Sequence, residues 1–215
     1  GGGRGTFCVT VAPPAPSHAP HFKRSVVFLL DRSGSMRGEP IECARRAVCH
    51  GLKTLGEGDE FGLIAFDHEV LQYAPMMRPA GEKEVSEAVY WVEDYCKARA
   101  LTDIMTPLSL AFDMLSQATG LPHVFLMTDG AVNDERQICH AVAARVQALG
   151  PAQAPRVSTF GIGRYCNHFF LKMLARIGRG SDDFALRPAS VEAQVRRMVE
   201  AAAQPVLAGC PPPPG

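Results

Sequence analysis

The sequence predicts an α/β fold in which helices cover both faces of a doubly wound, mostly parallel central sheet with one antiparallel edge strand. Uninterrupted apolar runs at 26–30 and 124–127 are typical of strands that are covered on both faces, as in a parallel sheet. Between such runs, apolar residues recur at helical spacing, so strands and helices alternate along the chain. This alternation favours right-handed crossovers within a single sheet.

The predicted strands are short and separated by helices or turn residues. The run EVLQYA at 69–74 is more polar than the others, and we expect it to return as the antiparallel edge strand through a turn at Asp67 and His68. In chain order, the predicted strands are 25–30, 60–66, 69–74, 123–128, 156–162 and 183–186.

The predicted helices are marked by apolar residues three and four positions apart, which form one buried face. Pro40 is suitably placed in the first turn of the first helix, because the N–H that proline lacks is unpaired there in any case. The acidic residues Asp134 and Glu135 open the fourth helix, where negative charge is favourable. The apolar positions fall within 41–55, 85–96, 108–115, 138–149, 171–177 and 191–202.

The 215 residues, 47% of them apolar, are enough to bury one α/β core, with little material for a second. We expect that domain at 25–204. Residues 1–24 are expected to form a short strand at Thr6–Val11 and a proline-rich linker, and residues 205–215 a proline-rich tail. The start GGGRG, without an initiating Met, indicates a segment of a larger protein.

The charge of the sequence argues against binding to nucleic acid or an anionic membrane, and its hydropathy argues against a membrane span. The 22 basic and 22 acidic side chains give a formal net charge of zero, so the sequence lacks the basic excess that binds nucleic acid or an anionic membrane. No apolar run approaches the ~20 residues that span a bilayer. We therefore expect neither a nucleic-acid partner nor a membrane span.

The seven cysteines follow no disulfide framework, and an odd number cannot all pair. Cys43 and Cys49 are expected on one helix, where six residues rise ~9 Å and place the two thiols beyond disulfide reach. Free, mostly buried thiols in a reducing compartment are favoured over a secreted disulfide scaffold, and the compartment itself stays open. The cysteines are Cys8, Cys43, Cys49, Cys96, Cys139, Cys166 and Cys210.

The first predicted strand ends in an acid and two hydroxyls spaced two residues apart: Asp31, Ser33 and Ser35. Gly34 and Gly38 allow a tight turn there, so the three side chains can converge on one point. Oxygen ligands with few charges suit a hard cation such as Mg²⁺, whereas zinc or copper would call for Cys and His at close spacing. The pattern indicates half of a metal site.

Two later segments can complete such a site. Asp129 follows the apolar run at 124–127 and precedes a glycine, just as Asp31 follows its own strand. Both acids are therefore expected at the carboxyl edge of neighbouring parallel strands, where open α/β sheets bind ligands. Thr102 and Asp103 lie in a separate loop and supply a further hydroxyl and carboxylate.

Together these residues resemble the metal-ion-dependent adhesion site (MIDAS) of the von Willebrand factor type A domain, over roughly 25–203. The family pattern is Asp-x-Ser-x-Ser, a distant Thr, and an Asp within Thr-Asp-Gly, and it matches Asp31, Ser33, Ser35, Thr102 and Asp129. The resemblance implies a Rossmann-like type A fold and a non-enzymatic binding module. It also implies that a Mg²⁺ or Mn²⁺ ion held by these five residues captures an Asp or Glu carboxylate of a partner protein.

Two longer stretches, TFGIGRYCNHFFLKMLARIGRG and TDGAVNDERQIC, are similar to the inter-alpha-trypsin-inhibitor heavy-chain-like proteins, particularly their plant-type relatives. The chain departs from the family pattern in one place. The family threonine usually follows two glycines, and here Ala100 and Leu101 precede Thr102.

Each candidate residue also has a purely structural interpretation. Asp31 and Asp129 can cap helices or turns, because Asp accepts hydrogen bonds from free backbone N–H groups. Asp103 is expected to cap the helix that begins near Met105 or Pro107 rather than to bind the metal. The segment Cys166–His168 is expected to be a turn and helix start, since it lacks a second Cys/His pair at metal-ligand spacing.

Two other functions compete with metal-dependent binding. A structural domain with a vestigial or occluded metal site would dock against other parts of the same protein, and the replacement of the usual glycines before Thr102 favours this alternative. A Mg²⁺-dependent phosphoryl-transfer enzyme would use Asp31 as nucleophile, but such chemistry also needs an acid two residues later, and that position is Ser33.

Overall fold

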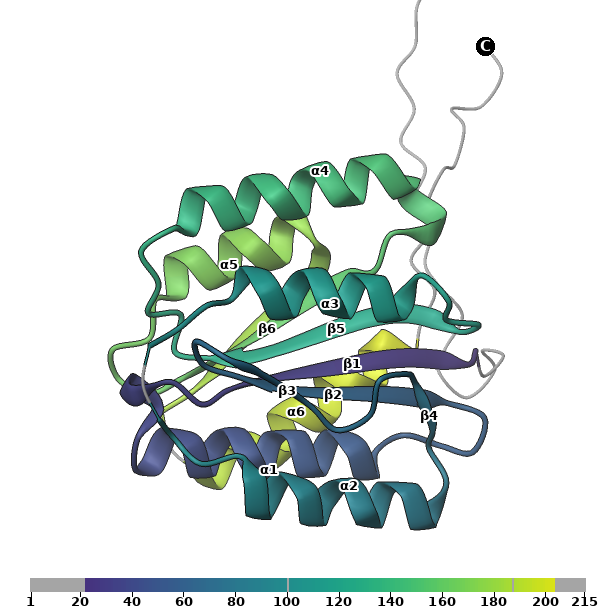
Figure 1. The fold of residues 1–215 in the computed structure, drawn as a ribbon, viewed down its shortest axis with the longest axis horizontal. Coiled ribbons are helices and arrows are strands. Elements are labelled where there is room, and N and C mark those ends of the chain that lie inside the picture. The colour runs from purple at the N-terminus through teal and green to yellow at the C-terminus, as the bar shows by residue number, and fades with distance from the viewer. Residues whose placement is uncertain (1–21, 100, 187, 204–215) are drawn as a thin grey trace, which may run out of the picture.

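A computed structural model describes residues 22–99, 101–186 and 188–203 (Figure 1). The predicted strand at 6–11, the proline-rich linker and the proline-rich tail lie outside the described residues. The predicted limits of the domain at 25 and 204 therefore stay predictions.

Among the described residues, seven strands form the central sheet, and its order is β3-β2-β1-β5-β6-β7, with β4 also paired to β2. The strands β1, β2, β5, β6 and β7 run parallel, whereas β3 and β4 run antiparallel to β2. The predicted mostly parallel sheet with an antiparallel edge is therefore confirmed. The strands are β1 (Arg24–Asp31), β2 (Glu60–Phe66), β3 (Val70–Gln72), β4 (Arg78–Pro79), β5 (Leu121–Thr128), β6 (Arg156–Ile162) and β7 (Arg179–Ala185).

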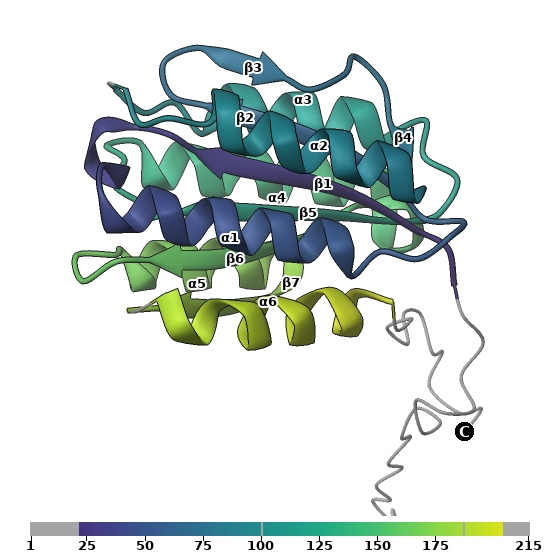
Figure 2. The same ribbon diagram turned by 90° about the horizontal axis from the view of Figure 1, so that it is seen from below.

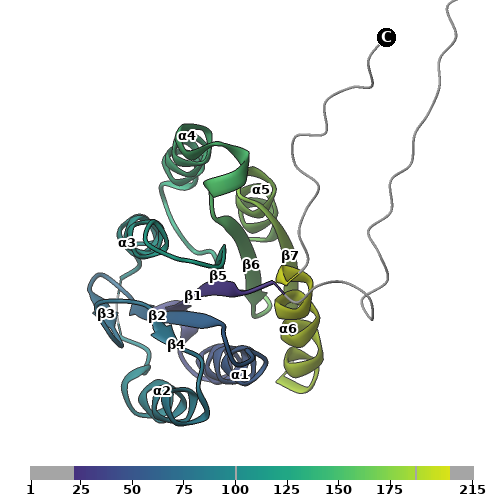
Figure 3. The same ribbon diagram turned by 90° about the vertical axis from the view of Figure 1, so that its right-hand side faces the viewer.

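In the part of the chain that the structure describes, six α-helices cover the sheet, three on each face. Figure 3 shows α1, α2 and α6 on one side and α3, α4 and α5 on the other, as the two buried apolar clusters require. A short 3-10 helix, η2 (Gly34–Met36), precedes α1. The α-helices are α1 (Glu39–Lys53), α2 (Glu82–Tyr95), α3 (Met105–Leu115), α4 (Glu135–Gln153), α5 (His168–Ile177) and α6 (Pro188–Ala202).

The central strand β1 contributes to both apolar layers because successive side chains of a strand point to opposite faces. Phe28 and Leu30 belong to the cluster under α1 and α6, and Leu29 belongs to the cluster under α3 and α5. All residues of β1 are buried. The helix α1 approaches β1 closely at Gly51, where a Cβ atom would lie 2.7 Å from a ring carbon of Phe28.

The order of the strands determines where a ligand can bind. From β1 the chain proceeds to β2 on one side, and it later returns to β5 on the other side of β1. The loops that leave β1 and β5 therefore diverge at their carboxyl ends, which lie on the left in Figures 1 and 2. Open α/β sheets bind ligands at such a switch point.

Three details differ from the sequence prediction. β7 begins at Arg179 instead of residue 183, because its polar first half also pairs with β6 at the edge of the sheet. The two-residue strand β4, which pairs with Glu60 and Phe61, was not predicted. α4 extends beyond the predicted apolar positions, and its regular helix breaks at Gly150, where φ is 73°.

The described cysteines are all free: Cys43, Cys49, Cys96, Cys139 and Cys166. Cys43 and Cys49 both lie on α1, as predicted, whereas Cys8 and Cys210 lie outside the described residues. None of the described helices is long and apolar enough to cross a membrane.

Candidate functional site

The Asp31 carboxylate is fully buried at the end of β1. Its Oδ2 accepts a hydrogen bond from the Thr128 hydroxyl at 2.5 Å, and its Oδ1 accepts one from the backbone N–H of Ser33 at 2.7 Å. Burial raises the pKa of Asp31 to about 6, and the negative charge of Asp129 adds to this, although both hydrogen bonds oppose the shift. The carboxylate is thus held in place by hydrogen bonds, and no cationic side chain of the described residues forms an ion pair with it.

Ser33 and Ser35 follow Asp31 in the chain, and exposure to solvent increases from Ser33 to Ser35. Ser33 is buried at the start of η2, and its Oγ lies 3.1 Å from the Oγ of the exposed Ser35. The turn is closed by a backbone hydrogen bond of 3.1 Å from the N–H of Met36, whose side chain is buried, to the carbonyl of Ser33. The anchored turn therefore presents two adjacent hydroxyls beside Asp31.

Asp129 follows β5 directly and is 9% exposed. Its Oδ1 accepts a hydrogen bond from Ala131 N–H at 3.0 Å, and its carbonyl accepts one from Asn167 N–H at 2.8 Å. Gly130 has a φ of 70°, and a Cβ there would lie 3.2 Å from Leu171, so the turn requires glycine. The loops after β5 and β6 are thereby joined at Asp129.

The structure adds Thr128 to the site, a residue that the sequence analysis did not single out. The Thr128 hydroxyl donates to Asp31 and accepts a hydrogen bond from Gly130 N–H at 2.9 Å, so it joins the ends of β1 and β5. In the sequence, Thr128 is the threonine of the Thr-Asp-Gly motif, but the motif does not reveal its contact with Asp31.

Thr102 is half-buried in the loop between α2 and α3. Backbone hydrogen bonds of 2.8 Å tie this loop to the sheet edge, from Arg99 N–H to the carbonyl of Arg32 and from Asp103 N–H to the carbonyl of Asp67. Among the described residues, no hydrogen bond links the Thr102 hydroxyl to the other four candidate ligands. The structure thus joins Asp31, Ser33 and Ser35 directly, brings Asp129 beside them, and places the Thr102 loop over the ends of β1 and β2.

Asp103 caps α3, as predicted. Its Oδ1 accepts a hydrogen bond of 2.9 Å from Met105 N–H, and its Oδ2 accepts one from the Thr106 hydroxyl at 2.5 Å. The predicted start of α5 is also confirmed, because the side-chain oxygen of Asn167 accepts a hydrogen bond from Phe170 N–H at 3.2 Å. Both side chains have structural roles at helix N-termini.

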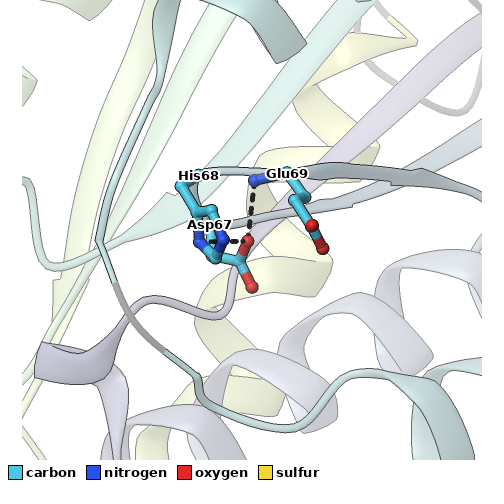
Figure 4. Close-up of side chains that lie close together, drawn as sticks. All are labelled: Asp67, His68 and Glu69. Atoms are coloured by element: carbon cyan, nitrogen blue, oxygen red, sulfur yellow. Dashed lines mark hydrogen bonds and ion pairs between the residues drawn. The ribbon is translucent and has the colours of Figure 1, made fainter.

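Asp67, His68 and Glu69 form the predicted turn between β2 and β3 (Figure 4). Asp67 Oδ1 accepts a hydrogen bond from Glu69 N–H at 2.7 Å and lies 3.1 Å from the Nδ1 of His68. Ligand-type atoms of these three residues lie within 4.8 Å of one another. Arg32 and Arg99 already pair with the Asp67 carboxylate, so we assign the cluster to a charge network rather than to a metal site.

Comparison with known proteins agrees with this architecture. The sequence model of the von Willebrand factor type A domain matches residues 24–184. The chain is 34% identical to mouse inter alpha-trypsin inhibitor, heavy chain 4, over 124 residues, which are 54% of this chain and 13% of that protein. It is 26% identical to bovine inter-alpha-trypsin inhibitor heavy chain H3 over 203 residues, which are 91% of this chain and 23% of that protein.

Two solved structures share the fold. The von Willebrand factor type A protein from Catenulispora acidiphila has a TM-score of 0.74 at 20% identity, covering 85% of this chain and 43% of that one. Proximal thread matrix protein 1 from the mussel byssus, in a structure with a zinc-occupied MIDAS motif, has a TM-score of 0.64 at 18% identity, covering 85% and 48%.

The chain spans less than a quarter of the length of the curated relatives described above. The family match nevertheless covers most of the chain, and the strand order and helix layers agree with it. The chain belongs to the von Willebrand factor type A domain family, and inter-alpha-trypsin inhibitor heavy chains are among the proteins to which it is similar.

Proposed function

We propose that this domain is a non-enzymatic protein-binding module in which a divalent cation captures an acidic side chain of a partner. The proposed metal ligands are Asp31, Ser33, Ser35, Thr102 and Asp129, and the proposed cation is Mg²⁺ or Mn²⁺. The partner is a protein that offers an Asp or Glu carboxylate, either a separate molecule or another domain of the parent chain.

The observation that carries the proposal is the environment of Asp31. A buried carboxylate is unfavourable unless it is paired, and burial raises the pKa of Asp31 to about 6. Among the described residues, no cationic side chain forms an ion pair with Asp31 or Asp129, whereas the buried Asp59 is paired with Arg24. A divalent cation beside Asp31 and Asp129 would supply the missing positive charge.

The available ligand atoms fit a hard cation. Carboxylate and hydroxyl oxygens suit Mg²⁺ and Mn²⁺, whereas zinc prefers thiolate and imidazole ligands. Burial, and secondarily the charge of Asp129, raise the pKa of the Cys166 thiol to about 11, so this neighbouring thiol stays protonated near neutral pH. A zinc-occupied MIDAS motif in the mussel protein still makes zinc a necessary comparison in any metal titration.

The ligand set also explains why a partner would bind. The five proposed protein ligands leave one position of an octahedral Mg²⁺ ion open, and a carboxylate of a partner can occupy it. A partner carboxylate would form a charge-assisted contact with the cation, and such contacts strengthen when water is excluded. The domain's own residues would hold and orient the cation, and the proposed function includes no catalytic step.

Isothermal titration with Mg²⁺, Mn²⁺ and Zn²⁺ tests the cation. We expect Mg²⁺ and Mn²⁺ to bind the wild type and to raise the free energy of unfolding, by about 2.7 kcal/mol at a concentration of 100 times Kd. Asp129→Ala should remove both effects while the circular dichroism spectrum is retained. Ser109→Ala, which changes an exposed serine on α3, is the matched control. Absence of Mg²⁺ and Mn²⁺ binding by the wild type would contradict the proposal.

Peptide binding tests the partner. On an array of peptides that each contain one Asp or Glu, together with matched Asn or Gln peptides, the wild type should bind only acidic peptides and only without EDTA. A structural docking domain would instead show a loss of thermal stability in Asp129→Ala, with no metal-dependent binding of any acidic peptide. Turnover of a phosphate ester that is abolished by Asp31→Asn would favour an enzyme.

A further inference from the structure

We infer that Arg99 is a positioning residue that holds the Thr102 loop at the metal site through an ion-pair cluster with Asp67, Arg32 and Glu69. This inference rests on the proposed function, because it concerns how that site is assembled. The four residues come from the loops after β1, β2 and α2, and the cluster therefore joins segments far apart in the sequence.

Asp67 is the centre of the cluster. Its side chain is fully buried, and its Oδ2 lies 3.3 Å from Arg32 Nε and 3.7 Å from Arg99 Nε. The Asp67 Oδ2 and Arg32 Nε atoms form no hydrogen bond of good geometry within the described residues. Buried ion pairs of this kind add little net stability, because desolvation offsets the charge attraction. The role of the cluster therefore lies in the backbone segments that it holds in position.

Arg32 connects the cluster to one half of the site. It stands between Asp31 and Ser33, and its guanidinium is almost completely buried against Asp67. Its backbone N–H donates to the carbonyl of Phe66 at 2.8 Å, and its own carbonyl accepts a hydrogen bond from Arg99 N–H at 2.8 Å. The backbone next to two proposed metal ligands is thus bound on one side to β2 and on the other to the Thr102 loop.

Arg99 connects the cluster to the other half. Its side chain pairs with Asp67 and, at 3.0 Å through Nη1, with Glu69. Four residues later, Asp103 N–H donates to the carbonyl of Asp67, so Thr102 lies between two anchored backbone positions. Leu101 is 77% exposed, so its side chain can replace the usual glycine without entering the site. Anchoring by charge explains how the loop keeps its place without the family glycines.

An electrostatic role and a positioning role of Arg99 predict opposite changes in cation affinity when the residue is replaced. Removing a positive charge near a cation site should strengthen cation binding if only the electrostatic field matters. Releasing the loop should weaken binding, because residues that orient metal ligands typically change affinity by 10- to 100-fold. Arg99 is suited to this test because its side chain is 48% exposed, and loss of a half-exposed ion pair has little effect on stability.

The experiment compares Mn²⁺ affinity of the wild type, Arg99→Gln, Arg99→Lys and the control Arg46→Gln, which removes an exposed positive charge on α1. We expect Arg99→Gln to bind Mn²⁺ about 10-fold more weakly, with an unchanged melting temperature in EDTA. Arg99→Lys should recover part of the affinity, and Arg46→Gln should bind as the wild type does. Amide hydrogen exchange should show faster exchange at Asp103 in Arg99→Gln only.

The outcomes separate this inference from the proposed function. If the wild type binds Mn²⁺ and Arg99→Gln binds it equally or more tightly, the positioning role of Arg99 is wrong, and the proposed metal site is unaffected. Weaker binding together with a lower melting temperature in EDTA would show a general loss of structure and also overturn it. Absence of Mn²⁺ binding by the wild type would overturn both.

Discussion

The Thr128 hydroxyl adds a side-chain link at the ends of the two paired strands that carry the acidic residues of the candidate site. Thr128 donates to Asp31 and accepts from Gly130 N–H, and all three groups are buried. Thr128→Val keeps the shape of the side chain but leaves a buried N–H and a buried carboxylate oxygen without these partners. We expect a loss of about 1–3 kcal/mol in the free energy of unfolding, measured by urea denaturation in EDTA.

Thr128→Ser is the matched control for this prediction, because serine keeps the hydroxyl and loses only a methyl group. We expect its stability to lie much closer to that of the wild type than to that of Thr128→Val. Equal stability of the valine and serine variants would mean that the hydroxyl does not hold the two strand ends together.

For single residues, the sequence reveals the candidate metal ligands more readily than the residues that hold those ligands in place. Asp31 and Asp129 stand out because each follows an apolar run, and Ser33 and Ser35 because of their spacing. Thr128 shows no such pattern, since its role depends on β1 and β5 being neighbours. The pairing of Asp67 with Arg32 and Arg99 joins three distant segments, and only the folded chain brings them together.

The packing of α1 on the sheet depends on one small residue. A Cβ atom at Gly51 would lie 2.7 Å from Phe28 Cε1, and Phe28 is fully buried. Alanine in place of glycine favours a helix by about 1 kcal/mol, but overpacking in a core costs about 1–3 kcal/mol. We therefore expect Gly51→Ala to lower the melting temperature, as measured by differential scanning calorimetry.

Relief of the clash tests the cause of this effect. In the double variant Gly51→Ala/Phe28→Leu, the smaller side chain leaves room for the new methyl group. The double variant should lose less stability than the sum of the two single changes. Additive losses would show that the contact with Phe28 is not the reason for glycine at this position.

At the element scale, buried strands and amphipathic helices follow from local pattern, and edge elements do not. The pattern predicts β1 and β5 because both of their faces are covered, which gives the uninterrupted apolar runs at 26–30 and 124–127. The first half of β7 is polar and partly exposed, and its pairing with β6 defines it. β4 has only two residues, one of them Pro79, and such a segment carries no strand pattern.

The whole molecule brings its candidate site together from four separate loops around the central strand. The loops after β1, β2 and β5 and the loop between α2 and α3 meet at one edge of the sheet, and hydrogen bonds and ion pairs between them fix their relative positions. The rigid parallel sheet beneath supplies the common frame. A ligand that bound only the folded state at this edge would therefore stabilise the entire fold.

The buried His123 makes the stability of the fold depend on pH. The residue is buried on β5, its Nε2 lies 2.8 Å from Ser158 Oγ, and its ring stacks on Phe125. Burial, and secondarily the charge of Arg156, lower the pKa of His123 to about 3. Because an unfolded histidine titrates near 6.5, the unfolded state binds more protons between these values. Stability from this residue is present above pH ~6.5 and is lost as pH falls.

His123→Phe removes this proton uptake and keeps an aromatic side chain beside Phe125. We expect the stability difference between wild type and His123→Phe to grow in favour of the wild type as pH rises from about 4 to 6, with a slope of up to ~1.4 kcal/mol per pH unit. Asp31, whose pKa is raised, contributes the opposite slope in both proteins, so it cancels in the difference. His140→Gln, which changes an exposed histidine on α4, is the control variant. Urea denaturation at several pH values measures these quantities, and a difference that stays constant with pH would contradict a neutral, buried His123.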